Sequence, residues 1–264
     1  MRKYFLVARN TWAETVSYRL SFVMWRFRVV LQILTIYFLW FSILPKNTSF
    51  LGYSQEGILT YILGTSLIGS IVIASRSFIV GEEINTGALS YYLLRPVNYF
   101  MYWFAKDAGD KAMNIAFSIL ELGILFLILK PPLFIQTNFL YILFFLISIF
   151  LALIMYFFLS FLIGLLGFWS PEVWGPRFIF QILLTFFAGG LFPLDIMPKT
   201  LFFIFQLLPF PYLLYFPLKI YLGHLSIMEI YKGFFILTAW TVILYWFLQF
   251  VWKKGLRSYA AYGK

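Results

Sequence analysis

The stretch at residues 139–169, FLYILFFLISIFLALIMYFFLSFLIGLLGFW, contains no charged residue. About 20 residues of helix cross the hydrocarbon core of a bilayer, so an apolar run of this length predicts a transmembrane helix. The whole chain is 62% hydrophobic and only 11% charged, which excludes an ordinary soluble domain. Further apolar runs lie on both sides of this stretch. The sequence therefore predicts an all-α membrane protein with six transmembrane helices, at residues 20–44, 57–79, 106–129, 139–169, 174–192 and 230–252.

The basic residues predict how these helices are oriented, because Lys and Arg near the ends of spans are retained on the cytoplasmic side. With the N-terminus inside, most of the 20 basic residues become cytoplasmic: Arg2, Lys3, Arg9, Arg19, Arg26, Arg28, Arg76, Arg95, Lys106, Lys111, Arg177, Lys253, Lys254, Arg257 and Lys264. The external set is Lys46, Lys130, Lys199, Lys219 and Lys232. We therefore expect a multi-pass protein of the plasma (inner) membrane with both termini in the cytoplasm.

The soluble segments are too short to fold independently, so residues 1–264 are expected to form one membrane domain. The net charge of +10, concentrated on one membrane face, indicates contact with anionic membrane lipids and not with nucleic acid. No cysteine is present, which excludes disulfides, thiolate metal sites and a cysteine nucleophile. On the outer side His224, Asp195 and Glu229 fit no metal-ligand spacing. We expect no catalytic residue, metal or cofactor in this chain.

Residues 1–17 read as an amphipathic helix that is retained, since they lack the pattern of a cleavable signal peptide. An apolar stripe recurs at helical spacing along it, formed by Phe5, Ala8, Trp12 and Val16. Such a helix lies in the inner membrane interface. It either leads into the first span or takes part in coupling to a partner.

A segment on the inner side, residues 81–110, reads GEEINTGALSYYLLRPVNYFMYWFAKDAGD. Two adjacent carboxylates, Glu82 and Glu83, precede a turn and then a short helix at residues 88–94. This helix ends before Pro96, because proline disfavours helical geometry in the residue that precedes it. Its apolar side suits a groove on a partner protein and consists of Leu89, Tyr92 and Leu93. An ordinary interfacial loop is the alternative.

A segment on the outer side, residues 192–223, reads FPLDIMPKTLFFIFQLLPFPYLLYFPLKIYLG. Its charge-free part, residues 200–218, is long enough for a seventh span, but Pro209, Pro211 and Pro217 would disrupt such a helix. A seventh span would also move the basic C-terminal end outside. We therefore expect a re-entrant pair of short helices that enters the outer leaflet.

Glu121 interrupts the third predicted span. A carboxylate near the middle of a span costs about 2.5–3.5 kcal/mol on insertion scales, so it should face the interior of the bundle. Either it contacts a substrate or proton in a translocation path, or it is a neutral carboxyl hydrogen-bonded to a polar neighbour on a facing helix, such as Ser160 or Gln181. Arg26 and Arg28 are expected to extend to the inner interface.

In their order, these segments resemble the membrane subunits of the ABC-type-2 export family. The inner resemblance is carried by Glu82, Glu83, Gly87, Leu89, Leu93, Leu94 and Pro96. The outer resemblance is carried by Gly190, Leu191, Phe192, Pro193, Leu194, Asp195 and Pro198, followed by Leu208 and Pro209. The ending at residues 255–259, GLRSY, is similar to a subgroup in which two different permease subunits accompany one ATPase.

The resemblance implies a permease subunit that forms half of a translocation path. Its cytoplasmic coupling helix would contact a separate ATPase through Glu82, Glu83, Gly87, Leu89, Tyr92, Leu93, Leu94, Arg95 and Pro96. Its external re-entrant gate would include Phe192, Pro193, Asp195, Pro198 and Pro209. Two ATPase copies and a second permease subunit, identical or different, would complete the exporter. ATP and magnesium would bind the ATPase, because this sequence lacks the G-x-x-x-x-G-K-[ST] loop that cradles phosphates.

Two other classes of function stay open at this point. A membrane-embedded enzyme that modifies lipid would need clustered acid, base or metal ligands. An ATP-independent transporter or channel would show symmetric halves or polar residues in several spans. The identity of a transported substrate does not follow from the sequence.

Overall fold

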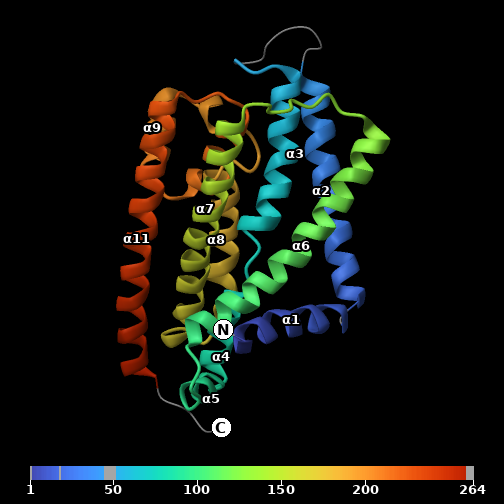
Figure 1. Cartoon of the computed structure of the whole chain (residues 1–264). Coiled ribbons are helices and arrows are strands. Elements are labelled where there is room, and N and C mark those ends of the chain that lie inside the picture. Colours follow the sequence, from blue (N-terminus) through green and yellow to red (C-terminus); the bar gives the residue numbers. More distant parts are fainter. Residues whose placement is uncertain (1, 18, 45–51, 260–264) are drawn as a thin grey trace.

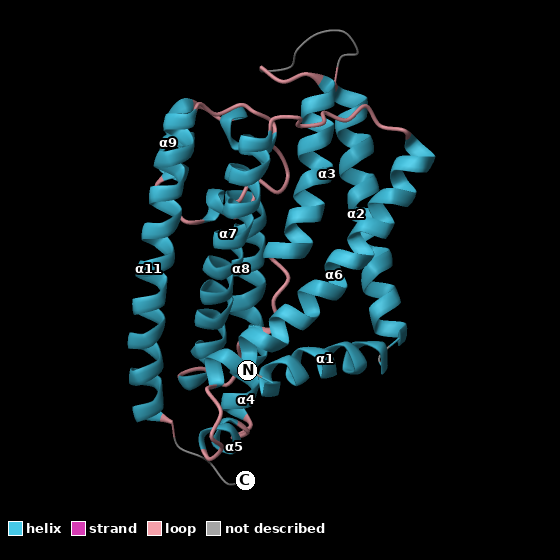
Figure 2. Ribbon diagram, in the orientation of Figure 1, coloured by secondary structure: helices cyan, strands magenta, loops and turns pink. Residues whose placement is uncertain are grey.

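The computed structural model describes residues 2–17, 19–44 and 52–259 (Figure 1). Every regular element in this part of the chain is helical (Figure 2). The α-helices are α1 (Arg2–Ser17), α2 (Arg19–Ile43), α3 (Gln55–Val72), α4 (Val80–Asn85), α5 (Leu89–Leu93), α6 (Tyr99–Leu129), α7 (Phe139–Leu165), α8 (Trp174–Phe187), α9 (Lys199–Gln206), α10 (Tyr215–Tyr221) and α11 (Ile227–Ser258). Short 3₁₀ turns are η1 (Ser77–Ile79), η2 (Leu166–Phe168), η3 (Leu194–Ile196) and η4 (Phe210–Tyr212).

Within the described residues, 4 helical segments are long and apolar enough to cross a membrane: Phe22–Ile43, Tyr99–Leu129, Phe139–Phe168 and Ile227–Ser258. A fifth arises when α3 is joined to the helix that follows it, across a bend of 45°. The all-α membrane class is therefore confirmed, with 4 to 5 candidate spans.

The predicted fifth span, residues 174–192, is helical from Trp174 to Phe187. α8 has 14 residues, or about 21 Å of helix, which is shorter than a hydrocarbon core of about 30 Å. The chain turns at Gly189, whose φ of 78° is readily adopted by glycine. The amide of Gly190 then donates back to the carbonyl of Thr185 at 2.9 Å, which closes the helix end.

The predicted second span, residues 57–79, also ends earlier than expected, because the helix breaks after Val72. The ammonium of Lys111 on α6 donates to the carbonyls of Ile71 and Val72, both at 3.0 Å, and to that of Ala74. These are carbonyls that a helix end leaves without intrahelical partners. Lys111, which lies 39 positions from Val72 in the sequence, thus caps the C-terminal end of α3 where the chain bends.

After the break, η1 and α4 pack tightly against α7 and η2. A side chain at Gly164 would meet the Ser77 carbonyl at 2.9 Å, and one at Gly167 would meet the Gly81 carbonyl at 2.7 Å. The two glycines on the α7 side therefore allow the backbones to touch. This contact fixes α4 against the central helix α7.

The charge-free stretch at residues 200–218 forms two short helices, α9 and α10, instead of a seventh span. Pro209 precedes η4, and Pro211 lies within it, at the break between the two helices. Residues 215–220 of α10 are buried against the bundle. Two short helices therefore lie where the re-entrant pair was predicted, and proline accounts for the separation between them.

α1 lies across one end of the bundle (Figure 1). It contacts α6, where the Trp12 indole donates to the Gly109 carbonyl at 2.7 Å. Thr11 is buried, whereas Phe5 is 71% exposed. Part of the predicted apolar stripe therefore faces away from the protein, and the side chain of Val16 lies outside the described residues, as do Lys46 and Lys264.

Candidate functional site

α4 carries the two predicted carboxylates, which lie in different surroundings. Glu82 is exposed. Glu83 accepts hydrogen bonds from the Tyr99 hydroxyl at 2.5 Å and the Trp103 indole at 3.2 Å, both on α6. Burial raises the pKa of Glu83 above its ordinary value, although these two donors oppose the change. Glu83 therefore fastens α4 to α6, and Glu82 is the carboxylate that faces outward.

A short helix, α5, lies where the sequence predicted one, but two side chains of its predicted apolar side are covered by the protein. Leu89 is fully buried, and the Tyr92 ring packs against the rings of Tyr99 and Tyr102 at centroid distances of 5.4 and 5.0 Å. These two residues point inward because they anchor α5 on the start of α6. From Tyr91 to Arg95, the exposed side chains are Tyr91, Leu93, Leu94 and Arg95. We call these four residues the α5 patch.

The α5 patch is rigidly mounted. The guanidinium of Arg95 lies 3.5 Å over the Tyr91 ring. Pro96 accepts a hydrogen bond from the Lys3 ammonium of α1 at 2.8 Å. Gly87 has a φ of 78° in the turn before α5, as the sequence predicted for a glycine turn. The patch is thus held between α1, α4 and α6.

The end of α11 also reaches this turn. The Tyr259 hydroxyl lies 3.0 Å from the carbonyl of Gly87 and 3.1 Å from the hydroxyl of Ser90. Sequence reasoning assigned Tyr259 no contact, since it lies 172 positions from Gly87 and has no local signal for the pairing. The turn before α5 is therefore tied to the last helix as well as to α4.

At the opposite end of the bundle, four side chains form what we call the outer cluster: Tyr53, Asp195, Lys219 and His224. The Asp195 carboxylate accepts from the Tyr53 hydroxyl at 2.7 Å and from the Lys219 ammonium at 2.9 Å. Lys219 also lies 3.1 Å from His224 Nδ1. Burial, and then the charge of Lys219, lower the pKa of His224. The cluster joins η3, α10 and the start of α3.

The other predicted residues of the outer segment have structural positions nearby. Pro193, Pro198 and Pro209 immediately precede η3, α9 and η4, respectively. The Phe192 ring contacts the Phe186 ring of α8 at 6.0 Å. Only Asp195 of the five predicted gate residues belongs to the outer cluster. The described residues contain no group of three His, Cys, Asp or Glu side chains placed to hold a metal ion.

Glu121 has a partner that the sequence did not indicate. Both its oxygens accept hydrogen bonds from the guanidinium of Arg26 on α2, one of them at 2.5 Å, and Ser118 accepts another from Arg26 at 3.2 Å. Arg26 is 6% exposed. The expected extension of Arg26 to the interface is therefore wrong, and so is the expected bond from Glu121 to Ser160 or Gln181. An ion pair is what makes both charges tolerable at this depth.

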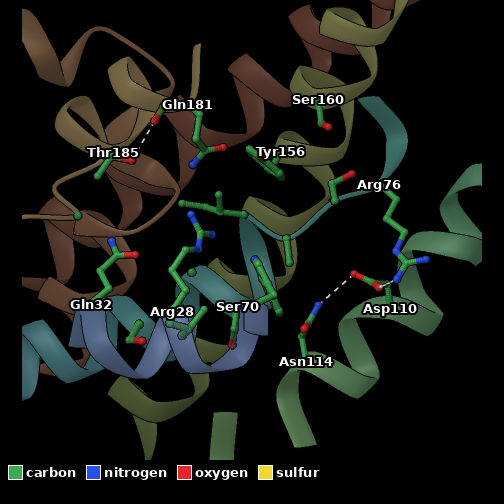
Figure 3. A pocket seen from close by; sticks show the side chains of 18 of the residues that line it. Arg28, Gln32, Ser70, Arg76, Asp110, Asn114, Tyr156, Ser160, Gln181 and Thr185 are labelled. Carbon is green, nitrogen blue, oxygen red and sulfur yellow. Dashed lines mark hydrogen bonds and ion pairs between the residues drawn. The ribbon is translucent and has the colours of Figure 1, made fainter. Parts of the chain in front are cut away.

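A cavity of about 920 Å³ lies between α2, α3, α7 and α8. Figure 3 shows Arg28 and Gln32 of α2 on one side of it, with Gln181 and Thr185 of α8 on the other. Arg76 and Asp110 pair at 2.7 Å on a further wall. Arg28, Gln32 and Gln181 are exposed, so the cavity opens to the surface between α2 and α8.

Residues 30–263 match the family described as ABC-2 family transporter protein. The chain belongs to this family. The match includes the α5 patch, the outer cluster and the part of the cavity wall that follows residue 29. No curated protein matches the chain. As an ABC-2 protein it is a multi-pass membrane component of a transporter.

Proposed function

We propose that this ABC-2 protein is the permease subunit of an ATP-driven exporter and that the α5 patch docks onto a separate ATPase subunit. The observation that carries the proposal is the α5 patch itself. Leu94 is 88% exposed and Tyr91 is 52% exposed, although Leu89 and Tyr92 beside them are anchored in the fold. A rigid helix with outward apolar side chains and a flanking arginine fits a groove on a partner.

The hydrolytic chemistry belongs to the partner in this account. The 264 residues contain no phosphate-cradling G-x-x-x-x-G-K-[ST] loop. We assign ATP and magnesium to two copies of the ATPase, and a translocation path to this chain together with a second permease subunit, identical or different. The opening of the cavity between α2 and α8 supports such a second subunit, since another chain would complete the wall.

The contacts of α5 supply a route for force. α4 links the patch to the bend after α3, Glu83 links it to α6, and Tyr259 links it to α11. Displacement of α5 by closure of the ATPase around ATP would therefore act on three helices at once. Such coupling requires that the ATP-bound and free ATPase hold the patch in different positions.

The proposed membrane topology has six crossings, of which α8 with the segment after it forms the fifth. α1 lies in the inner interface, and α9 with α10 forms the external re-entrant hairpin. α1, α5 and the end of α11 lie at the same end of the bundle, which supports a cytoplasmic location for this end (Figure 1). Lys3, Arg95, Lys253 and Arg257 concentrate positive charge there.

Cysteine labelling tests this topology, because the chain has no cysteine of its own. Single cysteines at positions 87 and 257 should react with a membrane-impermeant maleimide only after the membrane is opened. A cysteine at position 199 should react in intact cells. External labelling at position 257 would contradict an even number of crossings.

Purification in a mild detergent tests the function. The tagged chain should bring with it an ATPase subunit that carries the phosphate-binding loop, and the purified assembly should hydrolyse ATP. A chain that purifies without an ATPase and conducts solute without ATP would instead support a channel.

A further inference from the structure

The cavity between α2, α3, α7 and α8 contains positive charge that the protein does not neutralise. Four arginines line it: Arg26, Arg28, Arg76 and Arg177. Arg26 pairs with Glu121, and Arg76 pairs with Asp110. None of the ion pairs among the described residues includes Arg28 or Arg177. Two cationic side chains on two different helices are therefore left for a ligand.

The carboxylates of the wall are already engaged. Glu14 lies 3.6 Å from Lys106, and Asp110 pairs with Arg76 at 2.7 Å and accepts from Asn114 at 3.0 Å. A cationic ligand would find no free counter-charge in this cavity. The charge balance of the wall favours an anion.

The depth of Arg28 strengthens this argument. It lies six residues after Phe22, where the candidate span of α2 begins, which is about 9 Å along the helix. An arginine at such a depth in a span is costly unless it faces a cavity or a partner, and it marks a functional site by default. Arg28 lines the cavity and is drawn extending into it in Figure 3.

Arg177 approaches from the opposite wall. It lies in the first turn of α8, where its guanidinium covers the Phe78 ring. A guanidinium has planar, paired donors that match the oxygens of a phosphate or a carboxylate. Stacking on Phe78 holds this donor set in one orientation without using its hydrogen bonds.

The remaining wall is long and mixes apolar side chains with small polar ones such as Thr65, Ser70 and Ser160. The cavity is lined by α8 residues from Trp174 to Thr185, and then by Gly190 beyond the helix, a length of roughly 20 Å. Apolar side chains face the space from several helices, among them Ile33, Ile62, Phe178 and Leu214. The volume of about 920 Å³ lies near the upper end of the roughly 300–1,000 Å³ typical of ligand sites. The space therefore fits an extended apolar chain as well as a charged head.

We propose that this cavity binds an amphiphile with a single anionic phosphate or carboxylate head and an extended apolar chain, with Arg28 and Arg177 holding the head. This inference rests on the proposed function, because it names the class of substrate that the permease would carry. Gln32 and Gln181 lie near the two arginines along their helices and supply neutral hydrogen-bond donors.

Photolabelling of the full-length chain tests the inference. The chain, with any subunits that co-purify, is placed in phosphatidylcholine nanodiscs and exposed to monododecyl phosphate that carries a diazirine in its alkyl chain. Labelled peptides from α2 and α8 are expected. Unlabelled monododecyl phosphate should compete, whereas dodecyltrimethylammonium at the same concentration and inorganic phosphate alone should not.

Variants separate the site from general lipid contact. The double variant Arg28→Gln with Arg177→Gln should lose labelling at least tenfold, whereas Arg28→Lys with Arg177→Lys should retain a large part because the charge remains. Arg257→Gln removes an exposed arginine outside the cavity and should label as the original chain does. Unchanged elution and thermal unfolding of each variant would show that its fold is intact.

Two results would overturn the inference. One is equal labelling of the original chain and the double glutamine variant. The other is equal labelling by a dodecyltrimethylammonium probe that carries the same diazirine. Co-purification of the ATPase is a separate measurement. If no ATPase co-purifies, the proposed function is contradicted, whereas the photolabelling result tests the class of ligand.

Discussion

The hydroxyl of Tyr259 donates a hydrogen bond to the carbonyl of Gly87 at 3.0 Å, which joins the end of the last helix to the turn before α5. A second contact, to Ser90 at 3.1 Å, lies beside it. Without them, α11 would meet the inner segment through ring packing such as that of Trp252 on Tyr99. The proposed route for force from the ATPase to α11 therefore includes a specific polar contact.

Tyr259→Phe should weaken coupling without preventing assembly. One intramolecular hydrogen bond contributes about 0.5–1.5 kcal/mol, so the protein should remain folded and bound to its ATPase. Transport per ATP hydrolysed should fall several-fold, as measured in vesicles with monododecyl phosphate as the trial cargo. Tyr231→Phe, on an exposed part of α11, serves as the control. Equal coupling in the two variants would remove Tyr259 from the route.

Lys111→Met should destabilise the protein strongly. The change leaves the α3 carbonyls uncapped and removes the cation 3.7 Å from the buried Asp107 carboxylate. Loss of one partner of a buried ion pair costs about 3–5 kcal/mol. The thermal unfolding temperature in detergent measures this loss. Lys106→Met, which removes a partly exposed pair with Glu14 at 3.6 Å, should cost less than about 1 kcal/mol. Comparable shifts in both variants would contradict the capping role.

The Arg26 and Glu121 pair should behave as a structural unit. Either Arg26→Leu or Glu121→Leu alone leaves a buried charge, whereas both together remove it, so the double variant should be more stable than either single one. Thermal unfolding of the four proteins gives the coupling energy. A double variant that is stable but cannot transport would instead place Glu121 in the translocation path.

The outer cluster should make stability depend on pH. The pKa of His224 is lower in the fold than in the unfolded chain, so the unfolded chain binds more protons as pH falls below about 6.5. The contribution of neutral His224 is fully present above that pH and is lost as pH falls toward its folded pKa. Unfolding midpoints between pH 7.5 and 5 should decline more steeply for the original chain than for His224→Gln. Parallel curves would contradict this reading.

Local signals in the sequence predicted the parts of the fold that glycine and proline control. Gly87, Pro96 and Pro209 fixed the expected ends of α5 and of the external helices, because their backbone constraints act within a few residues. The break after Val72 could not be predicted in this way. Its cap, Lys111, lies 39 positions along the chain from Val72.

The same limit applies to the candidate sites. The Arg26 and Glu121 pair joins residues 95 positions apart, so neither periodicity nor spacing indicated it. The sequence also predicted that Leu89 and Tyr92 would contact a partner protein. In the structure the start of α6 lies against α5, and both side chains pack within this chain instead. A helix shows which residues share a face, and tertiary packing decides which face is covered.

The central claim is that the α5 patch docks the ATPase, and it is tested most directly by co-purification of the ATPase with three forms of the tagged chain. Leu94→Asp places a carboxylate at the most exposed position of the patch, and its desolvation in a groove should reduce the ATPase recovered at least tenfold. Asn98→Asp adds the same charge nearby but keeps the helix cap that Asn98 provides to α6, so recovery should match the original chain. Full recovery of ATPase with Leu94→Asp, at normal membrane insertion, would contradict the account.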